Sequence, residues 1–446
     1  MGVVIESEVW KPNQAVFIFL FISCVLSIFC LPTKLAANVI DHAPLASFLR
    51  FRHKFMFLYT LASVMEGLWT VFGEHELAYF GLSKEQMLTF LSFGYAVSTI
   101  IGSFLGVLSD LVGHKKLCLL FYLLHICLAV WKIVVGSPYI WLASLSLSMA
   151  SSIYSLSFET WMVVEHEKLG QRQDSLNDMF WSMTFFGSAS FIGSQMLANY
   201  LIDDNVNQNI ASTWKGTVIL AAAGIICTTR GSKEAPHIAT FRDYLVLLHR
   251  QANSDKRIWL LAWIQGCVHF AVASFWILWA PTIVADGREV LLGLIYTCLL
   301  GSKMLGSAIY PWFFHGRLML RIEEYLLYAF IVMGLALSVV AYDYQEIGVL
   351  VSLFCIFHAC EGLISPSLAR LRTMYVPNEV RGGIMSLSLM PANASILVCL
   401  VLRGYYQVIM NSTIIFFAVL GLFSAAGCMH LLKKWGKQLH HSRHHL

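Results

Sequence analysis

The sequence predicts an all-α membrane protein that crosses the bilayer thirteen times, as one N-terminal helix followed by two bundles of six helices. The first observation behind this prediction is composition: of 446 residues, 58% are hydrophobic and only 13% are charged. A typical soluble domain has about 45–50% apolar and about 25% charged residues. So few charges could not cover a soluble body of this size, and a disordered chain would need the opposite balance. The composition therefore argues against a water-soluble enzyme and excludes a disordered protein.

The second observation is the number of long apolar stretches. A helix that spans the roughly 30 Å hydrocarbon core needs about 20 mostly apolar residues, and its backbone must be hydrogen-bonded within the segment. Thirteen stretches meet this need, near residues 15–31, 54–73, 87–109, 117–135, 139–163, 178–202, 212–228, 258–284, 289–315, 322–341, 347–368, 384–407 and 411–432. Acids precede the first stretch and basic residues follow it, which favours a retained helix over a cleaved signal peptide.

The third observation is the distribution of basic residues. If the second stretch enters the membrane from the cytoplasm, the cytoplasmic segments contain 23 of the 30 Lys and Arg residues, as the positive-inside rule requires. The N-terminus is then outside and the C-terminus is cytoplasmic. The longest polar linker has six spans on each side, as in transporters built from two halves. We expect an N-terminal helix with a cytoplasmic linker at 1–53, six-helix bundles at 54–228 and 258–432, a cytoplasmic hinge loop at 229–257, and a basic, His-rich cytoplasmic tail at 433–446.

A short loop between the third and fourth stretches contains a motif. It runs Gly106-Val-Leu-Ser-Asp110-Leu-Val-Gly113-His-Lys115-Lys116. Glycine permits a tight turn between helices, and an acid at a helix end can interact with the positive N-terminus of a neighbouring helix or with a cation. The pattern GxxxDxxGxKK resembles the loop signature of the major facilitator superfamily, where this acid helps to latch the two halves in the outward-facing state. The resemblance implies the major facilitator fold of two six-helix bundles.

A second, narrower resemblance lies in the fifth stretch. The run Phe158-Glu159-Thr160-Trp161, followed by Glu165-His166, is similar to the FExW…EH signature of the molybdate-anion transporters, a branch of this superfamily. The extra N-terminal helix also belongs to that branch. Further matches lie at Glu66 and Trp69, Leu278-Trp279-Ala280-Pro281, Leu300-Gly301-Ser302 through Gly306-Ser307, and Gly362-Leu363 with Pro366-Ser367. The resemblance covers nearly the whole chain.

Three positions depart from that branch. It usually has arginine where this chain has Ser144 and Leu389, and it tends to have an acid where this chain has His269. Arginine would supply fixed positive charge and paired donors to an oxyanion. The missing arginines therefore leave the identity of the substrate open.

Ionisable side chains inside spans are costly in lipid, so they usually face a cavity and mark a transport pathway. Bundle helices one, four, seven and ten line the central cavity in this superfamily, and Lys303 lies on the eighth. The predicted substrate- or proton-binding residues are Glu66, Glu159, Lys303, His269, His358 and Glu361. Each has a structural alternative: the acids could bond across helices, the histidines could pack in the core, Glu361 could pair with His358 one turn away, and Lys303 could pair with an acid.

The predicted function is a secondary active transporter of a small oxyanion such as molybdate, working by alternating access about a midplane site. Acids in a low-dielectric cavity suit coupling to protons. Two alternatives stay open: a major facilitator carrier of another solute, either a cation or a neutral metabolite, and a non-transporting membrane receptor or scaffold. The latch motif argues against the scaffold, which would not need to switch states. We expect a monomer in the plasma membrane with no enzymatic activity, cofactor, metal site or nucleic-acid partner.

Overall fold

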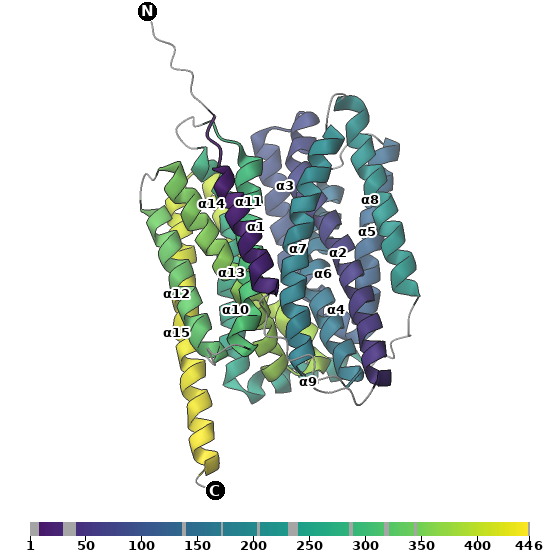
Figure 1. Cartoon of the computed structure of the whole chain (residues 1–446). Helices are drawn as coiled ribbons and strands as arrows, with labels where there is room; N and C mark the ends of the chain where they lie inside the picture. The colour runs from purple at the N-terminus through teal and green to yellow at the C-terminus, as the bar shows by residue number, and fades with distance from the viewer. Residues whose placement is uncertain are drawn as a thin grey trace, which may run out of the picture.

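The computed structural model describes residues 9–29, 42–135, 140–170, 173–202, 206–230, 240–284, 289–315, 321–342 and 346–444. Nearly all of these residues are helical, and the long helices run side by side in two groups (Figure 1). The predicted all-α fold of two six-helix bundles with one additional N-terminal helix is confirmed.

The N-terminal half follows the additional helix α1 (Gln14–Phe29). Its helices are α2 (His42–Tyr79), the continuous α3 (Lys84–Val97), η1 (Ser98–Gly102) and α4 (Ser103–Val112), then α5 (His114–Val135), α6 (Ile140–Lys168), α7 (Gln173–Ile202) and α8 (Val206–Thr229).

The C-terminal half begins after α9 (Phe241–Ser254). It contains α10 (Lys256–Ile283), α11 (Leu292–His315), α12 (Ile322–Ala341), α13 (Ile347–Tyr375), the single turn η3 (Asn378–Val380), α14 (Arg381–Gly404) and α15 (Asn411–His444). We call the end of the bundle where α9 lies the α9 end, and the other end, where α1 begins, the opposite end (Figure 1).

Helix α9 was missed by the sequence analysis, which treated 229–257 as a polar loop. Thr240 caps it, because its hydroxyl accepts a hydrogen bond from the backbone N–H of Asp243. Its buried residues Tyr244 and Leu248 are one turn apart on one face. The linker between the halves therefore has an amphipathic helix that packs against the end of the bundle. Residues 231–239 of the linker lie outside the described part of the chain.

The helices differ in how apolar they are. Among the described residues, eight helices are long and apolar enough to cross a membrane, and α1 and the segment Thr213–Thr229 are shorter apolar helices. The long helices α2, α6 and α7 are not among these eight. Two of them carry Glu66 and Glu159, and α6 and α7 are rich in serine. Polar side chains of these three helices contact neighbouring helices. The helices can therefore be less hydrophobic than a segment that faces only lipid.

Helix α1 packs against the C-terminal half although it begins the chain. Leu20 of α1 lies against Gly301 of α11, and the indole N–H of Trp312 donates a hydrogen bond of 3.1 Å to the carbonyl of Ser27. Each half has its own core, with Phe55, Phe121 and Phe158 in the N-terminal half and Phe275, Phe354 and Phe357 in the C-terminal half. Side chains at the interface between these two packed bodies are thus the candidates for function.

Candidate transport site and latch

Three predicted residues of the C-terminal half form one cluster. The Lys303 ammonium on α11 donates a hydrogen bond of 2.6 Å to Oε1 of Glu361 on α13. Nδ1 of His358 lies 2.7 Å from Oε2 of the same carboxylate. Glu361 and His358 are buried, whereas the Lys303 side chain is 23% exposed. The cluster therefore contains one partly exposed cation, Lys303, that is paired with a buried acid, Glu361.

Close packing of α11 on α13 and aromatic rings hold this cluster in place. A Cβ on Gly306 would lie 1.9 Å from the carbonyl oxygen of Ala359, and one on Gly362 would lie 2.0 Å from that of Lys303. Only glycine permits this approach. The ring of His358 packs between Phe275 and Trp276 at centroid distances of 4.6 and 4.9 Å, and its Nε2 has no hydrogen-bond partner among the described residues.

Glu66 lies in the N-terminal half, away from that cluster. Its carboxylate oxygen Oε2 is 3.9 Å from Nε2 of His125 on α5, and both atoms are buried without a hydrogen-bond partner among the described residues. His125 was not predicted as a site residue, although an ionisable residue inside an apolar stretch could have indicated it.

Glu159 lies at the interface of the halves towards the α9 end. It accepts hydrogen bonds of 3.0 and 2.5 Å from Arg372 on α13, and one of 3.2 Å from Arg381 on α14. Arg381 is fully buried. Both arginines had been counted as cytoplasmic loop residues, because their positions near helix ends gave no sign that they turn inward to an acid.

His269 lies on α10 and contacts α14 within the C-terminal half. Its Nε2 lies 2.8 Å from the side-chain oxygen of Asn393 on α14. This contact gives the ring a partner within its own half, which is the packing alternative considered above.

The loop motif forms a contact between three elements. Asp110 of α4 accepts hydrogen bonds of 2.9 and 2.8 Å from the backbone N–H groups of Gly382 and Gly383, at the start of α14. The Tyr244 hydroxyl of α9 donates a third, of 2.7 Å. Burial, together with the Asp110 charge, raises the pKa of the Tyr244 phenol above its ordinary value, so this phenol remains a donor.

The motif glycines have distinct roles in this contact. A Cβ on Gly106 would lie 2.1 Å from the hydroxyl of Ser386 on α14, so the position must be small. Gly113 has a φ of 112°, a conformation that favours glycine and permits the tight turn into α5. Lys115 is half-buried and Lys116 is exposed beside this turn.

The remaining signature residues are structural contacts of α6. Phe158 is fully buried, and Trp161 packs edge-on against Phe55 with centroids 5.5 Å apart. Nε2 of His166 lies 2.8 Å from the hydroxyl of Ser175, and Glu165 pairs with Lys168 on the helix surface at 3.4 Å. None of these four residues contacts the Lys303 cluster.

The two positions where the related branch usually has arginine are buried and uncharged. The Ser144 hydroxyl donates a hydrogen bond of 2.8 Å to the carbonyl of Phe90, and Leu389 packs with Leu156 and Met385. An anion bound between the halves would therefore depend on other cations, and Lys303 is the predicted site residue that carries one.

One more charged pair was missed. Lys132 of α5 donates a hydrogen bond of 2.5 Å to Glu76 of α2, and the Trp214 indole donates one of 2.8 Å to the same carboxylate. The ammonium lies 3.9 Å from the centroid of the Trp214 ring. All three side chains are buried and belong to the N-terminal half, so the cluster ties α2, α5 and α8 together.

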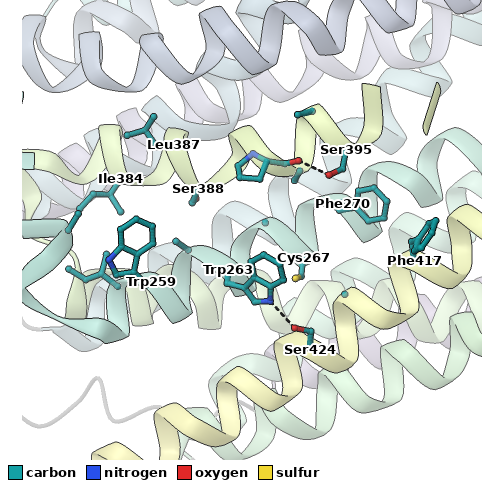
Figure 2. A pocket seen from close by; sticks show the side chains of 18 of the residues that line it. Trp259, Trp263, Cys267, Phe270, Ile384, Leu387, Ser388, Ser395, Phe417 and Ser424 are labelled. Atoms are coloured by element: carbon teal, nitrogen blue, oxygen red, sulfur yellow. Dashed lines mark hydrogen bonds between the residues drawn. The ribbon is translucent and has the colours of Figure 1, made fainter. Parts of the chain in front are cut away.

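A groove of about 1210 Å³ opens on the flank of the C-terminal half, between α9, α10, α14 and α15 (Figure 2). Trp259, Trp263, Phe270 and Phe417 line it, and the Trp263 indole donates a hydrogen bond of 2.8 Å to Ser424. No predicted site residue lines this groove, and its mostly apolar surface does not suit a small anion.

Comparisons with known proteins agree with this architecture. Residues 15–350 match the major facilitator family model MFS_5, described as sugar transporters, 12 TM. Two proteins named molybdate-anion transporter are similar: the one from Takifugu rubripes is 21% identical over 79% of each chain, and the one from Danio rerio is 21% identical over 82% of this chain and 81% of its own.

Two solved structures share the fold. A bacterial homologue of the iron transporter ferroportin, in an outward-facing state, has a TM-score of 0.67 at 13% identity and covers 87% of this chain and 100% of its own. The E. coli fucose:proton symporter FucP has a TM-score of 0.66 at 13% identity and covers 86% and 99%. The chain therefore belongs to the major facilitator superfamily of membrane transporters, as a divergent relative of proteins named molybdate-anion transporters.

Proposed function

We propose that this transporter is a secondary active carrier of a small oxyanion, with molybdate as the leading candidate, and that Lys303 is its anion-binding cation. The observation that carries the proposal is the partly exposed Lys303 ammonium, which is held 2.6 Å from buried Glu361 inside a membrane-spanning helix. A charged group in such a place is costly unless it serves a pathway. The names of the relatives supply the substrate class.

An incoming oxyanion would compete with the Glu361 carboxylate for Lys303. Both groups accept hydrogen bonds from an ammonium, so the anion can take the place of Glu361 if that acid is neutralised or turns to His358. His358 is placed for this role, because its Nδ1 already lies 2.7 Å from Glu361.

Alternating access would occur by rocking of the two halves. At the α9 end they are joined by buried charged groups, in the contacts of Asp110 and Glu159. At the opposite end they are joined by neutral hydrogen bonds of Gln195 to Gly293 and Thr297, and of Thr89 to Tyr405. We propose that the α9 end is cytoplasmic, that it is the closed gate in this state, and that the protein works as a monomer in the plasma membrane.

A carrier of a cation or neutral metabolite is the second candidate. It is favoured by the uncharged, buried Ser144 and Leu389, which remove two arginines that an oxyanion site would be expected to use. The division of the chain at the hinge 229–257 fits either substrate class.

The test is tracer uptake by purified protein in liposomes, with labelled molybdate against sulfate and an uncharged sugar. The wild type should accumulate molybdate, and K303M should lose it by roughly tenfold or more, because an unpaired anion in the membrane is costly. K84M, at an exposed position where a helix begins, is the matched control and should transport normally. Equal uptake by K303M and wild type would remove Lys303 from the site, and uptake of sugar alone would favour the second candidate.

A further inference from the structure

Glu66 differs from the other acids between the helices in having neither a Lys or Arg partner nor a set of several hydrogen bonds. Glu76, Glu159 and Glu361 each accept a hydrogen bond from a Lys or Arg side chain at 2.5–3.0 Å. Asp110 accepts three hydrogen bonds. Among the described residues, Glu66 has only His125 within salt-bridge distance, at 3.9 Å.

The two facing atoms of this pair are both unsatisfied. Oε2 of Glu66 and Nε2 of His125 are buried and have no hydrogen-bond partner among the described residues. A separation of 3.9 Å is too long for a direct hydrogen bond and leaves room for a bridging water or a small closing movement. The pair thus leaves a hydrogen-bonding capacity of each side chain unused, at Oε2 of Glu66 and at Nε2 of His125.

The net charge of the Glu66–His125 pair decides how many protons the pair binds. A buried carboxylate with no compensating charge is strongly disfavoured, and so is a lone buried imidazolium. The pair is neutral in only two forms: a protonated Glu66 beside neutral His125, or an ionised Glu66 beside protonated His125. Both forms contain one proton more than the fully deprotonated pair.

We propose that Glu66 and His125 together bind one exchangeable proton, and that this proton is the coupling ion of the carrier. This inference rests on the proposed transport function for its role, but the proton site itself is a property of two side chains in the N-terminal half. It is separate from the Lys303 cluster, which lies in the other half. Proton and anion would thus bind on different halves, so that both are present when the halves close around them.

Hydroxyl groups connect the site to its surroundings. The Ser151 side chain of α6 is exposed and hydrogen-bonds with Glu66. One turn further towards the α9 end, the Ser63 hydroxyl lies 2.8 Å from that of Tyr154, which donates a hydrogen bond of 3.1 Å to the Tyr59 hydroxyl.

These hydroxyls lie between two carboxylates. Tyr154 interacts electrostatically with Glu66, and Tyr59 with Glu159. The adjacent helix α7 places Ser194 beside α2, where its hydroxyl donates a hydrogen bond to the carbonyl of Val64; serine does not titrate at physiological pH. Among the residues that the structure describes, Tyr59, Tyr154 and the more distant Glu159 are therefore the titratable groups around the pair, and they would form a proton path towards the α9 end.

The first test separates coupling from transport. In liposomes with an imposed pH gradient, E66Q should lose gradient-driven accumulation of molybdate by roughly tenfold, while exchange of internal for external molybdate continues. H125N should shift the pH dependence of accumulation. E165Q, at a half-buried surface position of α6, is the matched control and should behave as wild type. Undiminished accumulation by E66Q would overturn the proposal.

The second test needs no substrate. Infrared difference spectra of purified wild type, recorded across a pH titration, should show either the carbonyl stretch of a buried protonated carboxyl or the ring modes of a buried imidazolium, one for each neutral form of the pair. The signature should be lost in E66Q, altered in H125N and unchanged in E165Q. If it is present and no solute is transported, the proposed function fails while the proton site stands. If wild type shows neither signature, or if the signature persists in E66Q, the proton site is wrong whatever the protein transports.

Discussion

The Tyr244 hydroxyl donates a hydrogen bond of 2.7 Å to Asp110, and this bond joins the helix that links the two halves to the loop motif of the first half. The same carboxylate is bound by two backbone N–H groups at the start of α14 in the second half. One buried acid therefore holds α4, α9 and α14 together, and its loss should favour opening of the α9 end.

Removing the tyrosine hydroxyl tests the contribution of α9. A hydrogen bond to a charged group contributes about 1.5–3 kcal/mol, so Y244F should shift the population towards a state open at the α9 end by roughly 10- to 100-fold. Distances between bio-orthogonal spin labels at the exposed positions Lys168 and Met374, measured by pulsed electron resonance, would report this shift. Y406F, at an exposed tyrosine, is the control, and identical distance distributions for Y244F and wild type would contradict the prediction.

The close approach of α14 to the latch gives a steric test. A Cβ on Gly383 would lie 2.1 Å from the Tyr244 hydroxyl, and one on Gly382 would lie 2.6 Å from Oδ1 of Asp110. Overpacking of this kind costs about 1–3 kcal/mol, so G382A and G383A should each loosen the closed state in the same distance measurement. Gly427 has nothing within 4 Å of its built Cβ, and G427A should leave the distances unchanged. If both variants keep the wild-type distances, α14 can move away from Asp110 and Tyr244 without a cost in free energy, which would contradict the prediction.

Glu159 has two proposed roles that one substitution distinguishes. E159Q removes the charge that Arg372 and Arg381 share across the halves. If Glu159 is part of the closed gate, E159Q should open the α9 end and slow transport while the pH dependence of uptake keeps its shape. If it binds the coupled proton, as the sequence suggested, the pH dependence should flatten. Uptake measured across a range of pH, together with the spin-label distances, decides between the two roles. If E159Q matches wild type in both measurements, both roles are excluded.

The buried pair of Glu76 and Lys132 should act on stability. Removing one partner of a buried ion pair costs about 3–5 kcal/mol, because the remaining charge is left uncompensated. K132M should therefore lower the melting temperature in detergent well below that of wild type, and a combined K132M and E76M variant should recover much of the loss. K215M, at an exposed position on α8, should melt normally. A normal melting temperature for K132M would contradict this prediction.

The fold was predictable because apolar stretches of the right length leave the backbone few alternatives in lipid. Helix α9 was the exception, since a 14-residue amphipathic helix in a polar linker has no run long enough to span a membrane. Its signals were local: a threonine cap at Thr240 and apolar residues one turn apart. The latch motif could also be found from sequence, because its glycines and acid occupy a fixed short spacing.

The partners of the buried charges could not be found in this way. Glu159 and Arg372 are separated by 213 residues and meet only because α6 and α13 come together at the interface of the halves. Lys132 lies within the predicted span 117–135, but its pairing with Glu76 depends on how α2 and α5 are rotated about their axes. Neither hydropathy nor motif spacing predicts how two helices are rotated relative to each other.

The sequence by itself determined that this chain is helical, membrane-embedded and divided into two halves, since these features follow from composition, segment length and the positions of basic residues. Only the tertiary structure decided which ionisable groups are paired and which are not. It joined Lys303 to Glu361 and left Glu66 facing His125 without a cation. The physical reason is that apolar burial acts on every residue of a stretch, whereas an ion pair depends on two side chains meeting within a few ångströms.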